Sequence, residues 1–334
     1  LSTNNFYMLP EALINNVFSL HENEKRGSIS LGVILNEDGS VSFSEIVQSI
    51  IKVNYRLSYI EADELIDYAP KEEEDLSIIS MILKKRKCWR NNLGAIEIQE
   101  SHGKIIVKDN IPSLKIVDPT LSRQLVSEAM ILYGNLISEF TKQNNIPVPY
   151  RVQESFVKCY KKEYTDNKEN ILYNFLLKKT MGKTYYSLNP MVHNSLGLSS
   201  YLHATSPIRR YADLLVQYQL NRFLNNKDLI LKGDVENLIL SINNLGRQNN
   251  MKYREDQKFL LKKWFEKNPI IEHNVILLEW INRYKNICIF YFVEYKLSSI
   301  CYFKSKYDLN IGDNFKVKFY SNNCNDILYF NFLS

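Results

Sequence analysis

Cysteine is scarce in this chain, which has five among 334 residues. The five are scattered, odd in number and form no Cys-x-x-Cys pair; they stand at positions 88, 159, 288, 301 and 324. This pattern argues against a disulfide framework and against a zinc site, and it fits a reducing compartment. We therefore expect a cytoplasmic protein.

Long hydrophobic runs are also lacking. No stretch reaches the roughly 20 apolar residues of a membrane-spanning helix, and no signal peptide or solenoid repeat is present. We expect no membrane partner. The apolar fraction of 45% is ordinary for a globular protein, and the length suits one large domain with a smaller one. The net charge of +5 permits an RNA partner without requiring one.

What the chain does carry is a loop that brings two adjacent arginines to the start of a helix. From Gly197 to Asp213 it reads Gly-Leu-Ser-Ser-Tyr-Leu-His-Ala-Thr-Ser-Pro-Ile-Arg-Arg-Tyr-Ala-Asp. Ser206 is a good N-cap and Pro207 suits the first helical position, so the pattern predicts a helix that begins here. The expected buried stripe of this helix has apolar residues three and four apart: Ile208, Tyr211, Leu215 and Tyr218.

Arg209 is the first candidate for chemistry in this loop. On the predicted helix its guanidinium lies near the free amides and the positive end of the dipole, which together make a strong phosphate site. The alternative is a capped surface helix in which Arg209 pairs with Asp213 one turn later. For an arbitrary Ser-Pro-x-Arg that alternative is favoured, because short motifs are weak evidence.

The complete string is longer and more specific. Thr-Ser-Pro-Ile-Arg-Arg-Tyr-Ala-Asp, preceded by His193 and by Gly197-Leu198-x-x-Tyr201, resembles the signature of the RNase II family of exoribonucleases. The resemblance implies hydrolysis of single-stranded RNA from its 3′ end to nucleoside 5′-monophosphates, with Mg²⁺ held by carboxylates. It implies that Arg209 is catalytic and contacts the scissile phosphate. It also implies RNA contacts by nearby residues: His203, Thr205, Ser206 and Arg210.

An extended segment from Pro147 to Gln153 carries further candidates. The resemblance implies that Tyr150 and Arg151 line the RNA channel, although Gln153 stands where the family usually has histidine. Phe156 falls where some members place an aromatic ring on the last base; the alternative is an ordinary core residue.

The last predicted helix runs from Val235 to Lys267 with a break near Gly246. It carries two more candidate site residues. The resemblance implies that Glu255 is catalytic and that Arg254 contacts RNA. A salt-bridged helix surface explains both residues equally well.

Periodicity predicts an α+β chain before that helix. The first expected element is a hairpin of 29–35 and 41–50 with its turn at 36–39. Helices are expected over 58–68, 71–87 and 119–141. Strands are expected at 95–98 and 104–107, on either side of Gly103. The expected core face of the helix over 119–141 is Val126, Ala129, Met130, Tyr133, Ile137 and Phe140. The basic run Lys84–Lys87 is expected to be a solvated face, with RNA contact as the alternative.

After Asn268 the period changes to two. Five short strands predict a small OB-type barrel, whose candidates for RNA contact are Tyr302, Phe303, Lys304, Lys306 and Tyr307. The predicted domains are an RNase II-type catalytic domain, 1–267, lacking its N-terminal part, and an OB-type module, 270–334.

The family's metal-binding cluster, Asp-x-x-x-x-x-Asp-x-Asp-Asp, does not occur in these residues. No two aspartates are separated by one residue, and Asp63, Asp67 and Asp75 have other spacings. We therefore expect no metal ligands in this chain and expect the chain to be a fragment or a truncated product. Two hypotheses stand: an exoribonuclease whose site is completed by other sequence, or a non-catalytic RNA-binding fragment.

Overall fold

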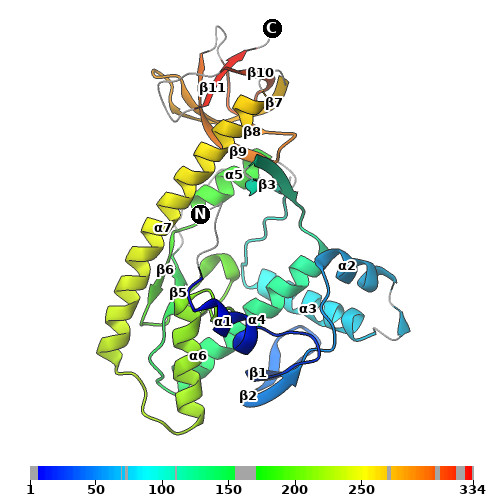
Figure 1. The fold of residues 1–334 in the computed structure, drawn as a ribbon, viewed down its shortest axis with the longest axis vertical. Coiled ribbons are helices and arrows are strands. Elements are labelled where there is room, and N and C mark those ends of the chain that lie inside the picture. Colours follow the sequence, from blue (N-terminus) through cyan, green and yellow to red (C-terminus); the bar gives the residue numbers. More distant parts are fainter. Residues whose placement is uncertain are drawn as a thin grey trace.

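The computed structural model describes residues 7–68, 70–71, 74–109, 111–154, 171–268, 272–304, 309–320 and 328–332. It consists of a mixed α+β body, a small β-barrel, and a long helix, α7 (Lys232–Lys267), that runs from the body to the barrel (Figure 1). The predicted α+β class is confirmed. Within the described part of the chain, no helix has the length and apolar character that a membrane crossing requires.

Helix α4 (Leu121–Gln143) is central to the body, where α2 (Tyr59–Tyr68) and α3 (Glu74–Asn92) pack on it. These helices match the predicted ones to within a few residues. The predicted hairpin is also confirmed: β1 (Lys25–Leu35) pairs antiparallel with β2 (Val41–Lys52) and follows the short helices α1 (Glu11–Leu13) and η1 (Ile14–Phe18). Its turn needs Gly39, whose φ is +86° and where a Cβ would lie 2.4 Å from the Lys85 carbonyl oxygen.

The predicted core face of α4 is confirmed at Ile137, with Tyr133 and Phe140 packed against the same core, and is wrong at Val126 and Ala129. Val126 is 39% exposed, whereas the buried face combines apolar, small and polar residues: Ser122, Glu128, Leu132, Gly134, Asn135, Ile137, Ser138 and Thr141. The polar residues have partners, such as the Ser138 hydroxyl with that of Ser200 at 2.7 Å. A Cβ on Gly134 would lie 2.3 Å from the Leu202 carbonyl oxygen, so this face receives the backbone of the segment around Leu202.

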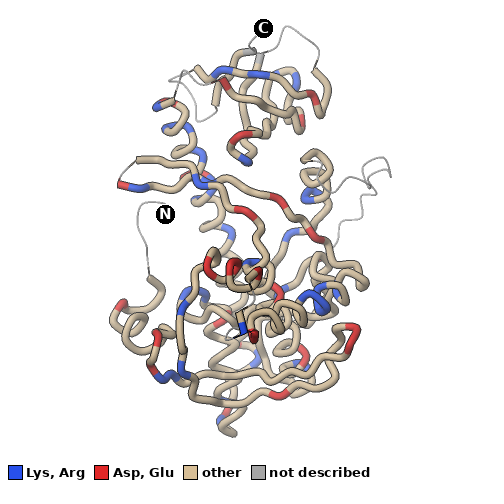
Figure 2. Tube along the Cα trace, turned by 90° about the vertical axis from the view of Figure 1, so that its right-hand side faces the viewer, with Lys and Arg blue, Asp and Glu red and all other residues tan. Residues whose placement is uncertain are grey.

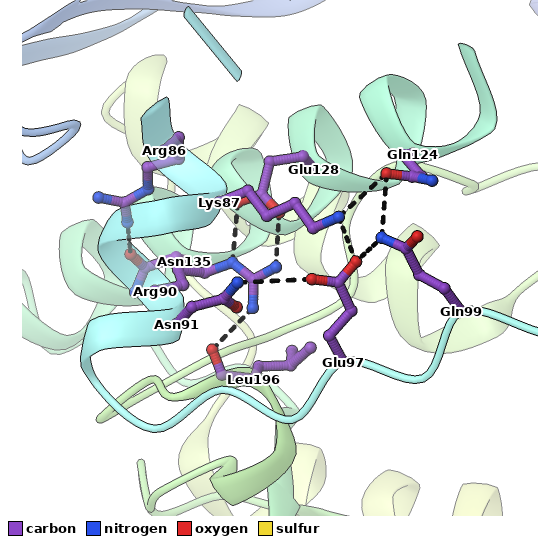
Figure 3. A network of polar contacts seen from close by, with 10 residues as sticks. All are labelled: Arg86, Lys87, Arg90, Asn91, Glu97, Gln99, Gln124, Glu128, Asn135 and Leu196. Carbon is purple, nitrogen blue, oxygen red and sulfur yellow. Dashed lines mark hydrogen bonds and ion pairs between the residues drawn. The ribbon is translucent and has the colours of Figure 1, made fainter. Parts of the chain in front are cut away.

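Two buried arginines of α3 hold this interior together (Figure 3). Arg90 forms a two-pronged ion pair with Glu128 of α4, at 2.8 and 2.5 Å, and donates to the Leu196 carbonyl oxygen at 2.9 Å. Arg86 is 1% exposed and donates to the Gly39 carbonyl oxygen and to the Asn135 side chain at 3.2 and 3.0 Å. The expectation of a solvated basic run therefore fails at Arg86, although Lys84 and Lys85 are exposed.

The remaining strands of the body form small sheets. Residues 95–98 are not a strand; β3 (His102–Lys108) pairs instead with β4 (Ile111–Val117). Gly103 lies within β3, where a Cβ would be 1.9 Å from the Tyr295 carbonyl oxygen of the barrel. The other elements are β5 (Tyr150–Gln153), α5 (Ile171–Thr180), β6 (Thr184–Ser187), η4 (Asn194–Leu196) and α6 (Tyr211–Leu224).

The predicted five-stranded barrel is confirmed. Its strands are β7 (Glu272–Asn282), β8 (Ile287–Phe292), β9 (Leu297–Lys304), β10 (Asn314–Tyr320) and β11 (Leu328–Phe332), and they close in the order β7-β8-β9-β11-β10. Leu260, Leu261 and Phe265 of α7 pack into the barrel core, so helix and barrel are joined rigidly there. Helix α7 continues through Gly246, so the predicted break is wrong.

The Arg90–Glu128 pair gives a stability prediction. Glu128→Gln leaves the guanidinium of Arg90 buried without a countercharge, and we expect the free energy of unfolding to fall by about 3–5 kcal/mol. Urea unfolding measures this. The matched control is Glu97→Gln, whose pair with Lys87 is partly exposed and is expected to contribute at most about 1 kcal/mol. Equal losses in the two variants would contradict the assignment.

Candidate functional site

The segment with the two adjacent arginines is a turn and not the first turn of a helix. Helix α6 begins at Tyr211, and its N-cap is Arg210 in an extended conformation (φ −129°, ψ 118°). The Ser206 carbonyl oxygen accepts the amides of Arg209 and Arg210 at 3.2 and 3.0 Å. The predicted N-cap at Ser206 is therefore wrong, because the backbone closes a separate turn before the helix starts.

The predicted buried stripe of this helix is wrong at its tyrosines. Tyr211 and Tyr218 are each 46% exposed, whereas Leu215 is buried. The buried face of α6 instead includes two polar residues, Asp213 and Gln219, both with no exposed surface. Gln219 donates to the Pro147 carbonyl oxygen at 3.0 Å.

Asp213 holds the turn in place. Its Oδ2 accepts the Ser206 amide and a guanidinium nitrogen of Arg210, both at 2.8 Å. The alternative expectation of an Arg209–Asp213 pair is therefore wrong, because the carboxylate pairs with Arg210. Oδ1 of Asp213 and Nε of Arg210 are buried and have no hydrogen-bond partner among the described residues.

Arg209 is thereby left as an exposed cation. Its Nη2 donates to the Ser206 hydroxyl at 3.1 Å, and it has no carboxylate partner in the part of the chain that the structure describes. Arg210 also donates to the Thr205 hydroxyl, at 3.4 Å. One side of the turn is fixed by the buried carboxylate of Asp213, which pairs with the partly exposed Arg210. The other side presents the exposed guanidinium of Arg209, and this arrangement suits an anion.

Aromatic and imidazole rings extend the site toward β5 and β6. His193, Tyr201 and His203 form a series of edge-to-face contacts, each with centroids 5.5 Å apart. The Tyr186 hydroxyl lies 2.8 Å from Nδ1 of His203, and the Arg151 guanidinium lies over the Tyr186 ring at 4.7 Å. Burial lowers the pKa of Arg151, and the positive charge of Arg210 is near enough to lower it further, so Arg151 adds a third cation to this region.

Both histidines are neutral at physiological pH. Burial and the nearby Arg210 and Arg151 lower the pKa of His203 to about 3, and burial with Arg151 lowers the pKa of His193 to about 4. Burial raises the pKa of Tyr201 to about 12. The positive charge of the site therefore belongs to its arginines alone.

Comparison with known proteins agrees with this geometry. The RNB domain matches residues 1–226. The chain belongs to the RNB domain family. An uncharacterized ribonuclease of Synechocystis is 29% identical over 283 residues, a match covering 84% of this chain and 42% of that protein.

Two solved structures share the fold. RNase R of Mycoplasma genitalium, in complex with ribose-methylated single-stranded RNA, has a TM-score of 0.85 at 18% identity, covering 98% of this chain and 61% of that one. An active-site mutant of the Dss1 exoribonuclease of Candida glabrata has a TM-score of 0.86 at 23% identity, covering 98% and 45%. The chain thus spans only part of the length of each of these proteins.

The other candidate residues of the predicted RNA channel lie either in the core or outside the described part of the chain. Tyr150 is 3% exposed, and its hydroxyl lies 3.2 Å from that of Thr141, so the structure places Tyr150 in the core. Gln153 is also buried; it donates to the Gly182 carbonyl oxygen at 2.9 Å and accepts the Ser195 amide at 3.1 Å. Phe156 lies outside the described residues.

Arg254 and Glu255 are exposed on α7, and neither contacts Arg209. Asn243 of α7 lies beside the site, because its side chain bonds the Tyr186 backbone at 2.9 and 2.8 Å. At 1.5 Å per residue, Glu255 is about 18 Å farther along the helix. A catalytic role for Glu255 stays a prediction.

The described residues do not fit a magnesium ion. They contain no group of three or more His, Cys, Asp or Glu side chains placed to hold a metal. Asp213 is already paired with Arg210, and Asp63 accepts the Ser122 amide at 2.7 Å. The site as described is cationic, so it suits a phosphate and not Mg²⁺.

The structure also changes which barrel residues are candidates for RNA contact. Phe303 has no exposed surface and belongs to the barrel core, so a stacking role for it is wrong. Tyr302 is half-buried against Tyr329, with centroids 4.9 Å apart. Lys306 and Tyr307, and the side chain of Lys304, lie outside the described residues. In the described part of the chain, Lys and Arg and also Asp and Glu are found in both the body and the barrel (Figure 2).

Sequence reasoning missed Tyr186 as a functional residue. It lies on β6, which pairs with β5 in a register that sets Tyr186 opposite Arg151. A Tyr-Tyr pair in a short β-prone segment was the available signal, and nothing in the sequence indicated which strand it would join.

The turn gives a second prediction. Asp213→Asn keeps an acceptor for the Ser206 amide but removes the countercharge of Arg210, and we expect about 2 kcal/mol less stability. Urea unfolding checks this. The control is Asp234→Asn, an exposed residue in the first turn of α7. An Asp213→Asn variant as stable as the control would show that the turn does not depend on the carboxylate.

Proposed function

We propose that this chain is the phosphate-recognising part of an exoribonuclease that hydrolyses single-stranded RNA from its 3′ end and releases nucleoside 5′-monophosphates. The observation that carries the proposal is the exposed, carboxylate-free guanidinium of Arg209, held on a turn that the buried carboxylate of Asp213 fixes within the matched RNB domain. RNase R of similar fold was solved with single-stranded RNA, which supports this substrate class.

In this proposal Arg209 binds the scissile phosphate and stabilises its developing negative charge. A guanidinium offers two parallel donors to two phosphate oxygens, and the Ser206 hydroxyl limits the orientations of its side chain. Arg151 and Arg210 add positive charge beside it, and Thr205 orients Arg210. Contact of Arg254 with RNA stays a prediction, as do the cytoplasmic location and the 1–267 and 270–334 domain boundaries.

We assign neither the metal ligands nor the attacking nucleophile of the reaction to the described residues. Mg²⁺ remains part of the proposal for the whole enzyme, with ligands outside the described residues. This chain contributes binding, orientation and charge stabilisation of the phosphate. The second candidate function, a non-catalytic RNA-binding fragment, rests on the same arginine turn.

Substitution of Arg209 tests its role. In a version of the protein that degrades RNA, Arg209→Lys should lower kcat at least tenfold with little change in RNA affinity, because a point charge replaces a bidentate donor. Single-turnover kinetics and the Kd for RNA measure the two effects. The control is Arg247→Lys, at an exposed position of α7. Turnover within twofold of wild type would remove Arg209 from the chemistry.

The chain by itself gives the next test. Residues 1–334 should bind a 5′-labelled single-stranded RNA but not shorten it in Mg²⁺, since the phosphate site is present and a metal-ligand cluster is not among the described residues. A time course on denaturing gels measures this. Mg²⁺-dependent shortening from the 3′ end would contradict the expectation that this chain lacks the metal ligands.

A further inference from the structure

His203 is held rigidly beside the arginine turn. Its Nδ1 lies 2.8 Å from the Tyr186 hydroxyl. Its ring is edge-to-face with Tyr186 (5.9 Å, 75°) and with Tyr201 (5.5 Å, 89°). The second ring nitrogen of His203, Nε2, has no hydrogen-bond partner among the described residues. It is also absent from the fully buried unpartnered atoms of these residues, so they leave part of its surface accessible.

The surroundings of His203 decide what Nε2 can bind. Burial, together with Arg210 and Arg151, lowers the pKa of His203 and keeps its imidazole neutral, so it does not act as a cation toward phosphate. A neutral imidazole has one donor and one acceptor, and Nδ1 already uses one of them with Tyr186. Nε2 is therefore left with one uncharged hydrogen bond to give or accept.

The position of the ring favours a sugar hydroxyl over a base edge. His203 is two residues before Thr205, whose hydroxyl accepts from Arg210. The ribose 2′-hydroxyl is on the carbon next to the one that carries the 3′-phosphate, so a group beside the phosphate-binding arginines reaches the sugar first. A hydroxyl both donates and accepts, so it matches either tautomer of the imidazole.

We propose that His203 is a specificity-determining residue that hydrogen-bonds the ribose 2′-hydroxyl and so favours RNA over DNA, with Tyr186 as its positioning residue. The inference rests on the proposed function, because it requires that the arginine turn holds a nucleic-acid phosphate. It assigns His203 to the sugar, whereas the three arginines recognise the backbone charge that RNA and DNA share.

The test compares oligonucleotides that differ by one oxygen. Residues 1–334 are titrated at fixed salt with a single-stranded RNA and with versions carrying one 2′-deoxynucleotide at each position in turn. At one position we expect the substitution to weaken wild-type binding about fivefold. In His203→Ala that penalty should disappear, and in His203→Gln, which keeps a donor and an acceptor, part of it should remain.

The outcomes separate this inference from the proposed function. Absence of RNA binding by the wild type would overturn both. RNA binding with no deoxy penalty, or with a penalty that persists in His203→Ala, would overturn the sugar contact alone. If His203→Ala does not fold, Tyr186→Phe decides: it removes only the hydroxyl at Nδ1, and the penalty should shrink, whereas an unchanged penalty would overturn the proposal.

Discussion

The buried carboxylate of Asp213 is the constraint on which the candidate site depends. One oxygen accepts both the Ser206 amide and the Arg210 guanidinium, so a single group closes the turn and neutralises one of its two arginines. The adjacent Arg209 then has no carboxylate partner among the described residues, where its guanidinium donates only to the Ser206 hydroxyl. Had the carboxylate paired with Arg209, as a simple one-turn spacing suggests, the site would present an ion pair to its ligand and would bind an anion weakly.

The same use of buried polar groups explains where prediction from the sequence failed. The α4 face was predicted from its apolar residues, but Glu128 and Asn135 are buried there, because Arg90 and Arg86 supply their partners. Hydrophobic periodicity detects burial only where the buried side chains are apolar. Partners distant in the chain cannot be read from local spacing. The start of α6 was misplaced for a different reason, because Ser206 closes a separate turn with Arg209 and Arg210 before the helix begins.

Where the core is apolar, the sequence was sufficient. Strand β10 alternates apolar residues that are half-buried or buried (Phe315, Val317 and Phe319) with exposed residues, and all five barrel strands were predicted. The hairpin turn was predicted from Gly39. At the site, Arg209 and Arg210 could be identified from one contiguous string, whereas the assignment of Glu255 depends on the register of a separate helix, which local spacing does not fix.

The central claim is that the Thr205–Arg210 turn binds a backbone phosphate of RNA. The most direct measurement is the salt dependence of RNA binding by residues 1–334, for the wild type and for Arg209→Gln, with Lys84→Gln on the exposed surface of α3 as control. Loss of one phosphate contact should reduce the slope of log K against log salt by about 0.7 in Arg209→Gln, and the control should keep the wild-type slope. An unchanged slope in Arg209→Gln would show that the turn does not bind the RNA backbone.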